Sequence, residues 1–579
     1  MRARADHPAN VSVTLSALRP NLYDMAVFLL VVAAFAGVAY GARAVNQPLS
    51  SLDAAPIQLD PGHLPNYALL TTLRMFAAIA CSLVFTFATG WAAAKSRKAE
   101  MVIVPALDIL QSVPILGFLT FTVMFFMGAF PGSRRRGAAA VFAIFTSQAW
   151  NMAFSFYQSL KTLPPDLDEA ARHFRLSPWQ RFWRLEAPYA TPGLVWNAMM
   201  SMSGGWFFVV ASESISIGAT KIALPGVGSY LAAAIDQKNL GAVGWAVATM
   251  ALVILAYDQL LFRPVVAWAD KFRVEQVASR ARPQSWVYDL LRRTRLLRRL
   301  GALGFGLHRR DFARSAGWRR SSRRASPTTE RAARAGDLLW TAAVAAAALW
   351  AAWLIARYLA QGLAPGDVAE AFKAGFATLL RVVALIAAAS VIWVPIGVWI
   401  GLRPALAERL QPLAQFLAAF PANVLFPIFV VAIARGDLDP NVWLSPLMVL
   451  GTQWYILFNV IAGASVFPGD LLEAASMSRV RGRLWWRSVM LPGVFPYYVT
   501  GALTASGGCW NASIVAEVAS WGDTRLEAYG LGAYIANATE AGNYHKVVLG
   551  VAVMSVFVLA FNRLVWRRMY RYAERRLRL

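Results

Sequence analysis

Residues 169–188 read EAARHFRLSPWQRFWRLEAP, and residues 473–492 read EAASMSRVRGRLWWRSVMLP. Both stretches begin with Glu-Ala-Ala, have an aromatic residue thirteen positions after the glutamate, and end on a proline nineteen positions after it. Two copies of one spacing, 304 residues apart, indicate that the chain contains a duplicated unit.

The same duplication extends outward from these stretches over most of the chain. Toward the amino terminus the matched residues are 307 positions apart, as for Thr71 and Thr378, and for Arg74 and Arg381. Elsewhere the separation is 304 residues, and the matched pairs include Trp150 and Trp454, Gly204 and Gly508, Trp206 and Trp510, Glu213 and Glu517, Gly226 and Gly530, and Tyr230 and Tyr534. Chance does not align tryptophan, glutamate and glycine over so much of each half.

The composition identifies the kind of protein that is duplicated. Of the 579 residues 58% are hydrophobic and 15% are charged, with a mean hydropathy of +0.47, whereas soluble domains are about 45–50% apolar and about 25% charged. The apolar residues form runs of roughly the 20 residues that cross a bilayer. We therefore predict an all-α polytopic membrane protein with two parallel pseudo-repeats of about six transmembrane helices each, about twelve in total. The spans are expected near 25–42, 68–94, 101–130, 138–158, 190–212 and 240–262, and near 337–360, 371–402, 409–434, 441–463, 494–516 and 546–565.

The net charge of +25 comes from short basic segments beside the apolar runs. Basic segments mark the cytoplasmic side of a membrane protein, so both chain ends are expected in the cytoplasm, and nucleic acid is not an expected partner. The predicted parts are a cytoplasmic tail (1–24), a first membrane domain (25–265) with its Glu-Ala-Ala loop at 160–188, a basic linker (266–336), a second membrane domain (337–566) with its loop at 464–492, and a basic tail (567–579). The linker is either a plain tether or a helix on anionic lipid. Arg134–Arg136 fall on the outer side, either as a solvated loop or as a basic lip that attracts an anion.

The paired stretches resemble the EAA loop of the permeases of binding-protein-dependent ABC importers, and the closest resemblance is to the nitrate/sulfonate/taurine-type permeases. The resemblance covers roughly 65–265 and 370–565. It implies two permease domains fused in one chain, each with a short cytoplasmic helix that docks on an ATPase subunit. The residues implied in this coupling are Glu169, Ala170, Ala171, Arg175, Phe182 and Pro188 in the first loop, and Glu473, Ala474, Ala475, Arg479, Trp486 and Pro492 in the second.

Arg175 and Arg479 depart from the family pattern, which has glycine at this position. Glycine permits a tight turn between two short helices, whereas an L-residue enters the left-handed region only at a cost of roughly 1 kcal/mol or more. Either the loop turns differently, or the two arginines contact the partner directly. An alternative role for Glu169 and Glu473 is to stabilise the start of a short helix through its exposed amides.

The resemblance also implies that the fifth span of each half lines the translocation path. The path candidates are Gln148, Trp206, Glu213, Gln453, Trp510 and Glu517, and the further polar candidates are Asn151, Asn197, Asn459 and Asn511. Polar side chains in spans face a cavity or another helix, so helix–helix hydrogen bonding is the competing interpretation for each of them, and Glu213 and Glu517 are alternatively braces for the helix ends.

No G-x-x-x-x-G-K-[ST] phosphate loop occurs, so ATP binding is not expected in this chain. Cys81 and Cys509 stand alone, and neither a catalytic set nor a metal site is predicted. We expect a non-enzymatic transporter subunit in a bacterial inner membrane without a cofactor of its own. Its expected partners are two copies of an ABC ATPase, which bind ATP and Mg, a periplasmic substrate-binding protein, and membrane lipid. A nitrate-, sulfonate- or bicarbonate-like anion is the favoured substrate. The alternatives are a ferric-type cation importer, a secondary transporter and a membrane-anchored scaffold.

Overall fold

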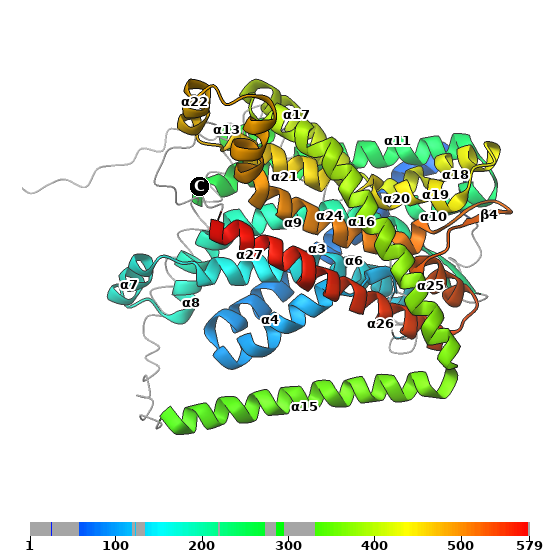
Figure 1. Cartoon of the computed structure of the whole chain (residues 1–579), viewed down its shortest axis with the longest axis horizontal. Helices are drawn as coiled ribbons and strands as arrows, with labels where there is room; N and C mark the ends of the chain where they lie inside the picture. Colours follow the sequence, from blue (N-terminus) through cyan, green and yellow to red (C-terminus); the bar gives the residue numbers. More distant parts are fainter. Residues whose placement is uncertain are drawn as a thin grey trace, which may run out of the picture.

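The computed structural model describes Met25, residues 57–117, Thr122, Phe125 and residues 134–217, 220–272, 285–294 and 330–576. Helices dominate this part of the chain, and they lie mostly side by side along one direction (Figure 1). Apart from Met25, Thr122 and Phe125, the predicted span at 25–42 and the second part of the span at 101–130 fall outside the described residues, as does most of the basic linker, so they stay predictions.

The main described elements of the first half begin with three helices before the EAA loop and end with a short helix. In order they are α3 (Leu64–Lys95), α4 (Arg97–Ser112), α6 (Arg134–Lys161), α7 (Pro165–His173), α8 (Pro178–Arg181), the π-helical turn η3 (Phe182–Glu186), α9 (Ala187–Glu213), β1 (Ser214–Ile217), β2 (Thr220–Ala223), α10 (Val227–Asp236), α11 (Leu240–Tyr257), the π-helical turn η4 (Asp258–Phe262) and α12 (Arg263–Ala269). A short helix, α13 (Trp286–Arg293), follows in the linker.

The second half repeats this order. Its elements are α15 (Glu330–Gly362), α16 (Pro365–Gly401), α17 (Pro404–Ala419), η6 (Ala422–Leu425), α18 (Phe426–Arg435), α19 (Pro440–Trp443), α20 (Ser445–Leu450), α21 (Trp454–Ser465), α22 (Gly469–Met477), α23 (Gly482–Trp485), the π-helical turn η7 (Trp486–Met490), α24 (Leu491–Ala516), β3 (Val518–Trp521), β4 (Thr524–Glu527), α25 (Leu531–Glu540), α26 (Tyr544–Phe561), the π-helical turn η8 (Asn562–Trp566) and α27 (Arg567–Arg576).

The duplication read from the sequence is visible in the element boundaries. Adding 304 to the bounds of η3 gives those of η7, and adding 304 to the bounds of η4 gives those of η8. The four-residue strands, α7 and α10 also match their counterparts under the same shift. Because π-helical turns are rare, their recurrence at matched positions indicates that both halves have the same local backbone path.

Six described helices are long and apolar enough to cross a membrane, or up to eight if each of two bent helix pairs is one span. These features support the predicted helical membrane fold of two repeats, while the number of twelve spans stays a prediction. The bent pairs, α17 with α18 and α19–α20 with α21, occur in the second half, and the second pair matches the single helix α6 of the first half. In the apolar stretch of α15, Leu338–Gly362, none of the residues is buried by protein, and Figure 1 shows α15 apart from the main bundle. A helix of this composition is expected to face lipid.

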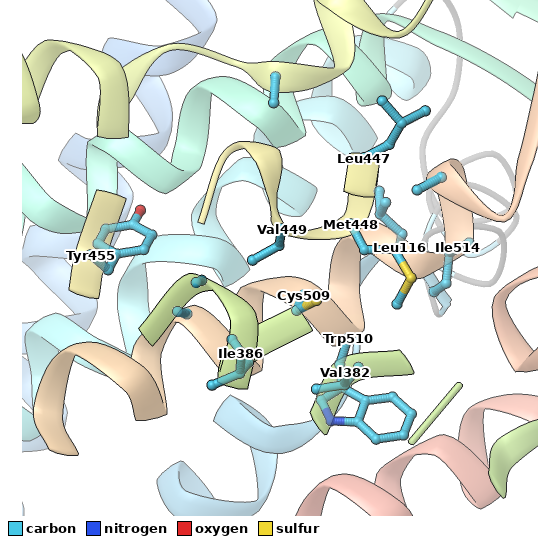
Figure 2. Close-up of a cluster of buried hydrophobic side chains, with 14 of the residues drawn as sticks. Leu116, Val382, Ile386, Leu447, Met448, Val449, Tyr455, Cys509, Trp510 and Ile514 are labelled. Atoms are coloured by element: carbon cyan, nitrogen blue, oxygen red, sulfur yellow. The ribbon is translucent and has the colours of Figure 1, made fainter. Parts of the chain in front are cut away.

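The two halves share a hydrophobic core. Trp510, Met448 and Val382 of the second half pack in one cluster with Leu116 of the first half (Figure 2). A second cluster in the first half includes Trp206 and also Val424 of the second half. The halves therefore form one packed body along their contact.

The EAA loops and the β-hairpins lie at opposite ends of the molecule. Figure 1 shows α7, α8 and α22 near the chain's carboxyl end, and β4 and α25 at the far end. Each hairpin is a two-stranded antiparallel sheet, β1 with β2 and β3 with β4. The glycine-rich segments 224–230 and 528–534 lead from each hairpin into a short helix, α10 or α25.

Candidate functional site: two EAA loops, two glutamate clusters and a cavity between the repeats

Each EAA loop is a helix, a tight turn and a second short helix that continues into a long span. In the first loop α7 ends in a turn where Leu176 N donates to Ala171 O at 3.1 Å and Arg175 N donates to Arg172 O at 2.9 Å. This pair of bonds defines a Schellman motif, which satisfies the last carbonyl groups of a helix. In the second loop the donors Val480 N and Arg479 N make the matching bonds to Ala475 O and Ser476 O.

Arg175 and Arg479 occupy the left-handed position of these turns. Their φ angles are 51° and 53°, a region in which L-residues are disfavoured by roughly 1 kcal/mol. The possibility that the loop turns differently is therefore wrong: the turn is of the kind that glycine makes, with arginine in the strained position. Both arginines are exposed.

The remaining predicted coupling residues divide into exposed and buried ones. Glu169 and Glu473 are exposed, whereas Ala171 and Ala475 are buried beneath them. Phe182 packs edge-to-face on Phe87 and Phe156, and Trp486 packs edge-to-face on Trp485. Pro188 and Pro492 lie near the start of α9 and α24, directly after the π-helical turns η3 and η7.

The position of the two glutamates within their helices differs from the expectation. Glu169 is the fifth residue of α7, and Glu473 is the fifth residue of α22, so both lie beyond the first turn. The acidic residues of the first turns are Asp166 and Asp168 in α7 and Asp470 in α22. Since the influence of the helix dipole fades within one turn, stabilisation of the helix start belongs to these aspartates. The exposed glutamates stay available to a partner.

At the opposite end of the molecule, Glu213 is held in a closed cluster. Its Oε1 accepts hydrogen bonds from Thr71 Oγ1 at 2.7 Å and from Arg74 Nη1 at 2.6 Å. Its Oε2 accepts the backbone N–H of Gly228 at 2.7 Å. A Cβ atom at Gly226 would lie 2.2 Å from Glu213 Oε2, so only glycine fits against the carboxylate. The cluster thus ties α3, α9 and the start of α10 together.

Glu517 has the matched environment in the second half. Thr378 Oγ1 donates to Glu517 Oε1 at 2.8 Å, and Arg381 Nη1 donates to the same oxygen at 3.2 Å. Ala533 N donates to Oε2 at 3.1 Å. Both glutamates are almost fully buried, and a buried carboxylate of this kind needs its charged partner. Their geometry matches the bracing of helix ends that was considered for them.

A cavity of about 520 Å³ lies between the two repeats. Its wall is formed mainly by α6 and α9 of the first half and by α20, α21, α24 and α26 of the second. Gly204 and its repeat match Gly508 both line the wall, which places the cavity on the approximate symmetry axis. Its polar lining residues include Thr146, Asn151, Ser201, Thr452, Thr504 and Asn511.

Among the path candidates, Trp510 lines this cavity, whereas Gln148, Trp206, Glu213, Gln453 and Glu517 do not. Gln148 Nε2 instead lies 3.1 Å from Met75 Sδ, and Gln453 accepts from Trp393 Nε1 at 2.9 Å. Trp206 is buried in the core of the first half. These five therefore do not form the wall of the observed cavity, because packing and hydrogen bonds between helices take their side chains elsewhere.

Of the four further polar candidates, two lie in the wall and two do not. Asn151 and Asn511 line the cavity, and Asn511 Oδ1 accepts the backbone N–H of Ile115 at 2.8 Å, which joins the two halves. Asn197 Nδ2 donates to Ser155 Oγ at 2.8 Å, and Asn459 Nδ2 donates to Tyr455 O at 2.8 Å, so both bond between or within helices.

The wall residues that sequence reasoning missed include a group of serines, threonines and glycines of α9 and α24. Their signal was the small-residue stretches Ser201-Met202-Ser203-Gly204 and Thr504-Ala505-Ser506-Gly507-Gly508. All lining residues of the cavity are uncharged in the described part of the chain. There, too, no cluster of three or more His, Cys, Asp and Glu is placed to hold a metal ion.

The fold and this site define a membrane protein of two repeats, with a loop motif repeated at one end and an uncharged cavity on the axis between the repeats. The chain belongs to the family of binding-protein-dependent transport system inner membrane components, whose model matches residues 85–262 and 393–579. The two matched segments correspond to the two repeats.

Curated relatives fall among importer permeases for small solutes. A bicarbonate transport system permease protein of Synechococcus elongatus is 29% identical over 189 residues, which are 33% of this chain and 65% of the relative. A nitrate import permease protein of Leptolyngbya laminosa is 26% identical over 189 residues, 33% of this chain and 64% of the relative. A taurine transport system permease protein of Escherichia coli K12 is 26% identical over 181 residues, 31% of this chain and 62% of the relative. The chain thus matches somewhat less than two thirds of the length of each of these relatives.

Proposed function

We propose that this chain is the membrane-spanning permease subunit of an ATP-binding-cassette importer of a bacterial inner membrane. Two fused permease domains enclose the path, and separate ATPase subunits bind and hydrolyse ATP. The observation that supports this most is the pair of EAA loops with the same backbone turn, set at one end of a molecule whose axial cavity lies between the repeats.

In this proposal each EAA loop is a coupling element. The exposed residues of α7 and α22, including Glu169 and Glu473, contact one ATPase subunit each. The buried Ala171 and Ala475 and the continuous path from α8 or α23 through a π-helical turn into α9 or α24 connect that contact to the spans. Movement of the ATPase pair would thereby be transmitted to both walls of the cavity.

For the substrate, we propose a small polar solute delivered by a periplasmic binding protein, with an oxyanion such as bicarbonate, nitrate or a sulfonate favoured. The uncharged hydroxyl and amide groups of the wall offer hydrogen bonds to such a solute. The two glutamates that would repel an anion are paired with Arg74 and Arg381 and lie outside the wall. The named solutes of the curated relatives agree with this class.

The experiment that tests the proposal is gentle purification from native membranes, identification of co-purifying proteins, and reconstitution in vesicles with the ATPase found. ATP-dependent uptake that is lost in the double variant Glu169→Lys/Glu473→Lys, with folding retained, is the expected result. Uptake driven by an ion gradient without ATP would overturn the proposal and favour a secondary transporter. Uptake of a metal cation would instead identify a ferric-type importer.

A further inference from the structure

The first EAA loop is attached to its membrane domain by charged side chains. Glu186, at the end of η3, is almost fully buried and accepts from Lys95 Nζ and, at 2.8 Å, from Arg181 Nε. Arg181 also pairs with Asp168 in α7. One chain of contacts therefore runs from the end of α3, through η3 and α8, to the helix of the loop. We call Lys95, Asp168, Arg181 and Glu186 the charged anchor.

The second loop has no charge at any matching position. Lys95 corresponds to Leu402 under the 307-residue offset. Under the 304-residue offset, Asp168, Arg181 and Glu186 correspond to Leu472, Trp485 and Met490. Met490 is fully buried in the core of the second half, and Leu402, Leu472 and Trp485 pack against that core. We call these four residues the apolar anchor.

The two anchors attach the EAA loops to their halves by different kinds of contact. In the first half, α3 is joined to the α8–η3–α9 segment by ion pairs at both ends, Lys95 with Glu186 near the loop and Arg74 with Glu213 at the far end. In the second half, an ion pair between the matching segments is present at the far end, between Arg381 and Glu517, and the loop end relies on apolar packing. Apolar contacts tolerate small sliding, whereas a buried carboxylate depends on its specific cationic partners.

We infer that Lys95, Asp168, Arg181 and Glu186 are positioning residues that hold the first EAA loop in register with α3, and that the two loops transmit ATPase movement by inequivalent attachments. The claim that the two loops transmit ATPase movement differently rests on the proposed coupling function. The claim that the four residues hold the first loop against α3 concerns this chain alone. Because Glu186 contacts two cations, its neutralisation should loosen the first loop and leave the second unaffected.

The structural test is hydrogen exchange of the full chain in lipid nanodiscs, without ATPase or substrate. In Glu186→Gln, the amides of α7 should exchange faster on the order of tenfold, since loss of one partner of a buried ion pair is strongly destabilising, and those of α22 should not change. Asp258→Asn is the control, because it removes an ion pair between Asp258 of η4 and Arg263 of α12, outside the charged anchor. Unchanged exchange in α7, or an equal increase in α22, would overturn the inference whatever the protein transports.

Two further kinds of variant distinguish a positioning role of the charges from a general loss of folding: one keeps the charge, and one replaces the charged anchor by the apolar anchor. Lys95→Arg retains the charge and should retain slow exchange in α7, whereas Lys95→Met should raise it. The conversion K95L/D168L/R181W/E186M copies the apolar anchor and is expected to restore slow exchange relative to Glu186→Gln. If this fourfold variant does not fold, the Lys95→Arg and Lys95→Met pair still decides, and equal exchange in the two would contradict the role of the charge.

The transport test uses the reconstituted transporter with its ATPase. Glu186→Gln should lower the number of solute molecules moved per ATP and the maximal uptake rate, with an unchanged KM, because the cavity wall is untouched. A raised KM with unchanged coupling would overturn the positioning role. If hydrogen exchange in α7 responds as expected but the chain shows no ATP-driven uptake, the role of the charged anchor stands and the proposed function is rejected.

Discussion

Arg175 and Arg479, 304 positions apart, adopt the same left-handed backbone conformation, with φ of 51° and 53°, at the turn of the two EAA loops. An arginine in this region is strained, and both side chains point from an exposed turn. The same strained residue at both matched sites is consistent with a use for the guanidinium groups in contact with the partner. That use can be separated from the strain by substitution.

Glycine at either position should stabilise the loop, and alanine should not. Arg175→Gly and Arg479→Gly remove the side-chain strain, so each is expected to stabilise its turn by about 0.5–1 kcal/mol, measured as slower hydrogen exchange in α7 or α22. Arg175→Ala is the control, because alanine keeps the strain and removes the guanidinium. If the guanidinium contacts the ATPase, glycine and alanine variants both lose coupled uptake; normal uptake in both would leave the arginines without a partner role.

The ion pair between Arg74 and Glu213 should be among the costliest contacts to break. Arg74→Met leaves Glu213 buried without its cation, and the expected destabilisation is about 3–5 kcal/mol. Arg381→Met should cost less, because Arg381 lies 3.2 Å from Glu517 whereas Arg74 lies 2.6 Å from Glu213. The measurement is thermal unfolding of the purified protein in nanodiscs. Arg263→Met, which breaks a partly exposed pair with Asp258, should change stability by less than about 1 kcal/mol, and equal losses in all three variants would contradict the ranking.

The sequence predicted the parts of the site that are repeated, and it missed those that are not. The EAA loops, the paired glycines and the matched glutamates all appeared under the 304-residue offset, and the structure places them at equivalent positions. The charged anchor was not predicted because Lys95 and Glu186 are 91 residues apart and have apolar counterparts in the second half. The left-handed turn was not predicted because arginine is a poor signal for it. A comparison of the two halves detects the residues that they share, so it cannot detect side chains that occur in only one half.

A contact between the halves at the hairpin end should depend on pH. Lys238 Nζ lies 2.8 Å from Asp523 Oδ2, and Gly522 N donates to Ile235 O at 3.1 Å beside it. The hydrogen bond from Lys238 lowers the pKa of Asp523 below its usual value of 3.8. Since the pKa of Asp523 is lower in the folded than in the unfolded state, its ion pair stabilises the folded state above the pKa of the unfolded state. This stabilisation is lost as the pH falls through the pKa of the folded state.

The resulting effect on the hairpin can be measured directly. Lowering the pH from 6 to about 3 should accelerate local opening of β3–β4. The opening is measured by hydrogen exchange, corrected for the pH dependence of the intrinsic exchange rate. In Asp523→Asn the hairpin should open more readily at pH 6 and show less change with pH. A pH response of equal size in this variant would assign the effect to another group. Because both side chains are largely exposed, the change should be small.

The sign of the substrate's charge can be tested at Asn511. This residue lines the cavity, and its Oδ1 accepts the N–H of Ile115. Asn511→Asp retains that acceptor and adds one negative charge to a wall that is otherwise uncharged in the described part of the chain. If the solute is an oxyanion, the rate of uptake should fall on the order of tenfold or more, since two like charges about 4 Å apart at the effective dielectric near a protein surface repel by roughly 4 kcal/mol. A cation would be retained or moved faster.

Asn511→Ala is the neutral control, because it removes the hydrogen bond to Ile115 without adding charge. Equal loss in the aspartate and alanine variants would assign the effect to the contact between the halves, whereas unimpaired anion uptake in Asn511→Asp would show that the anion does not pass this wall.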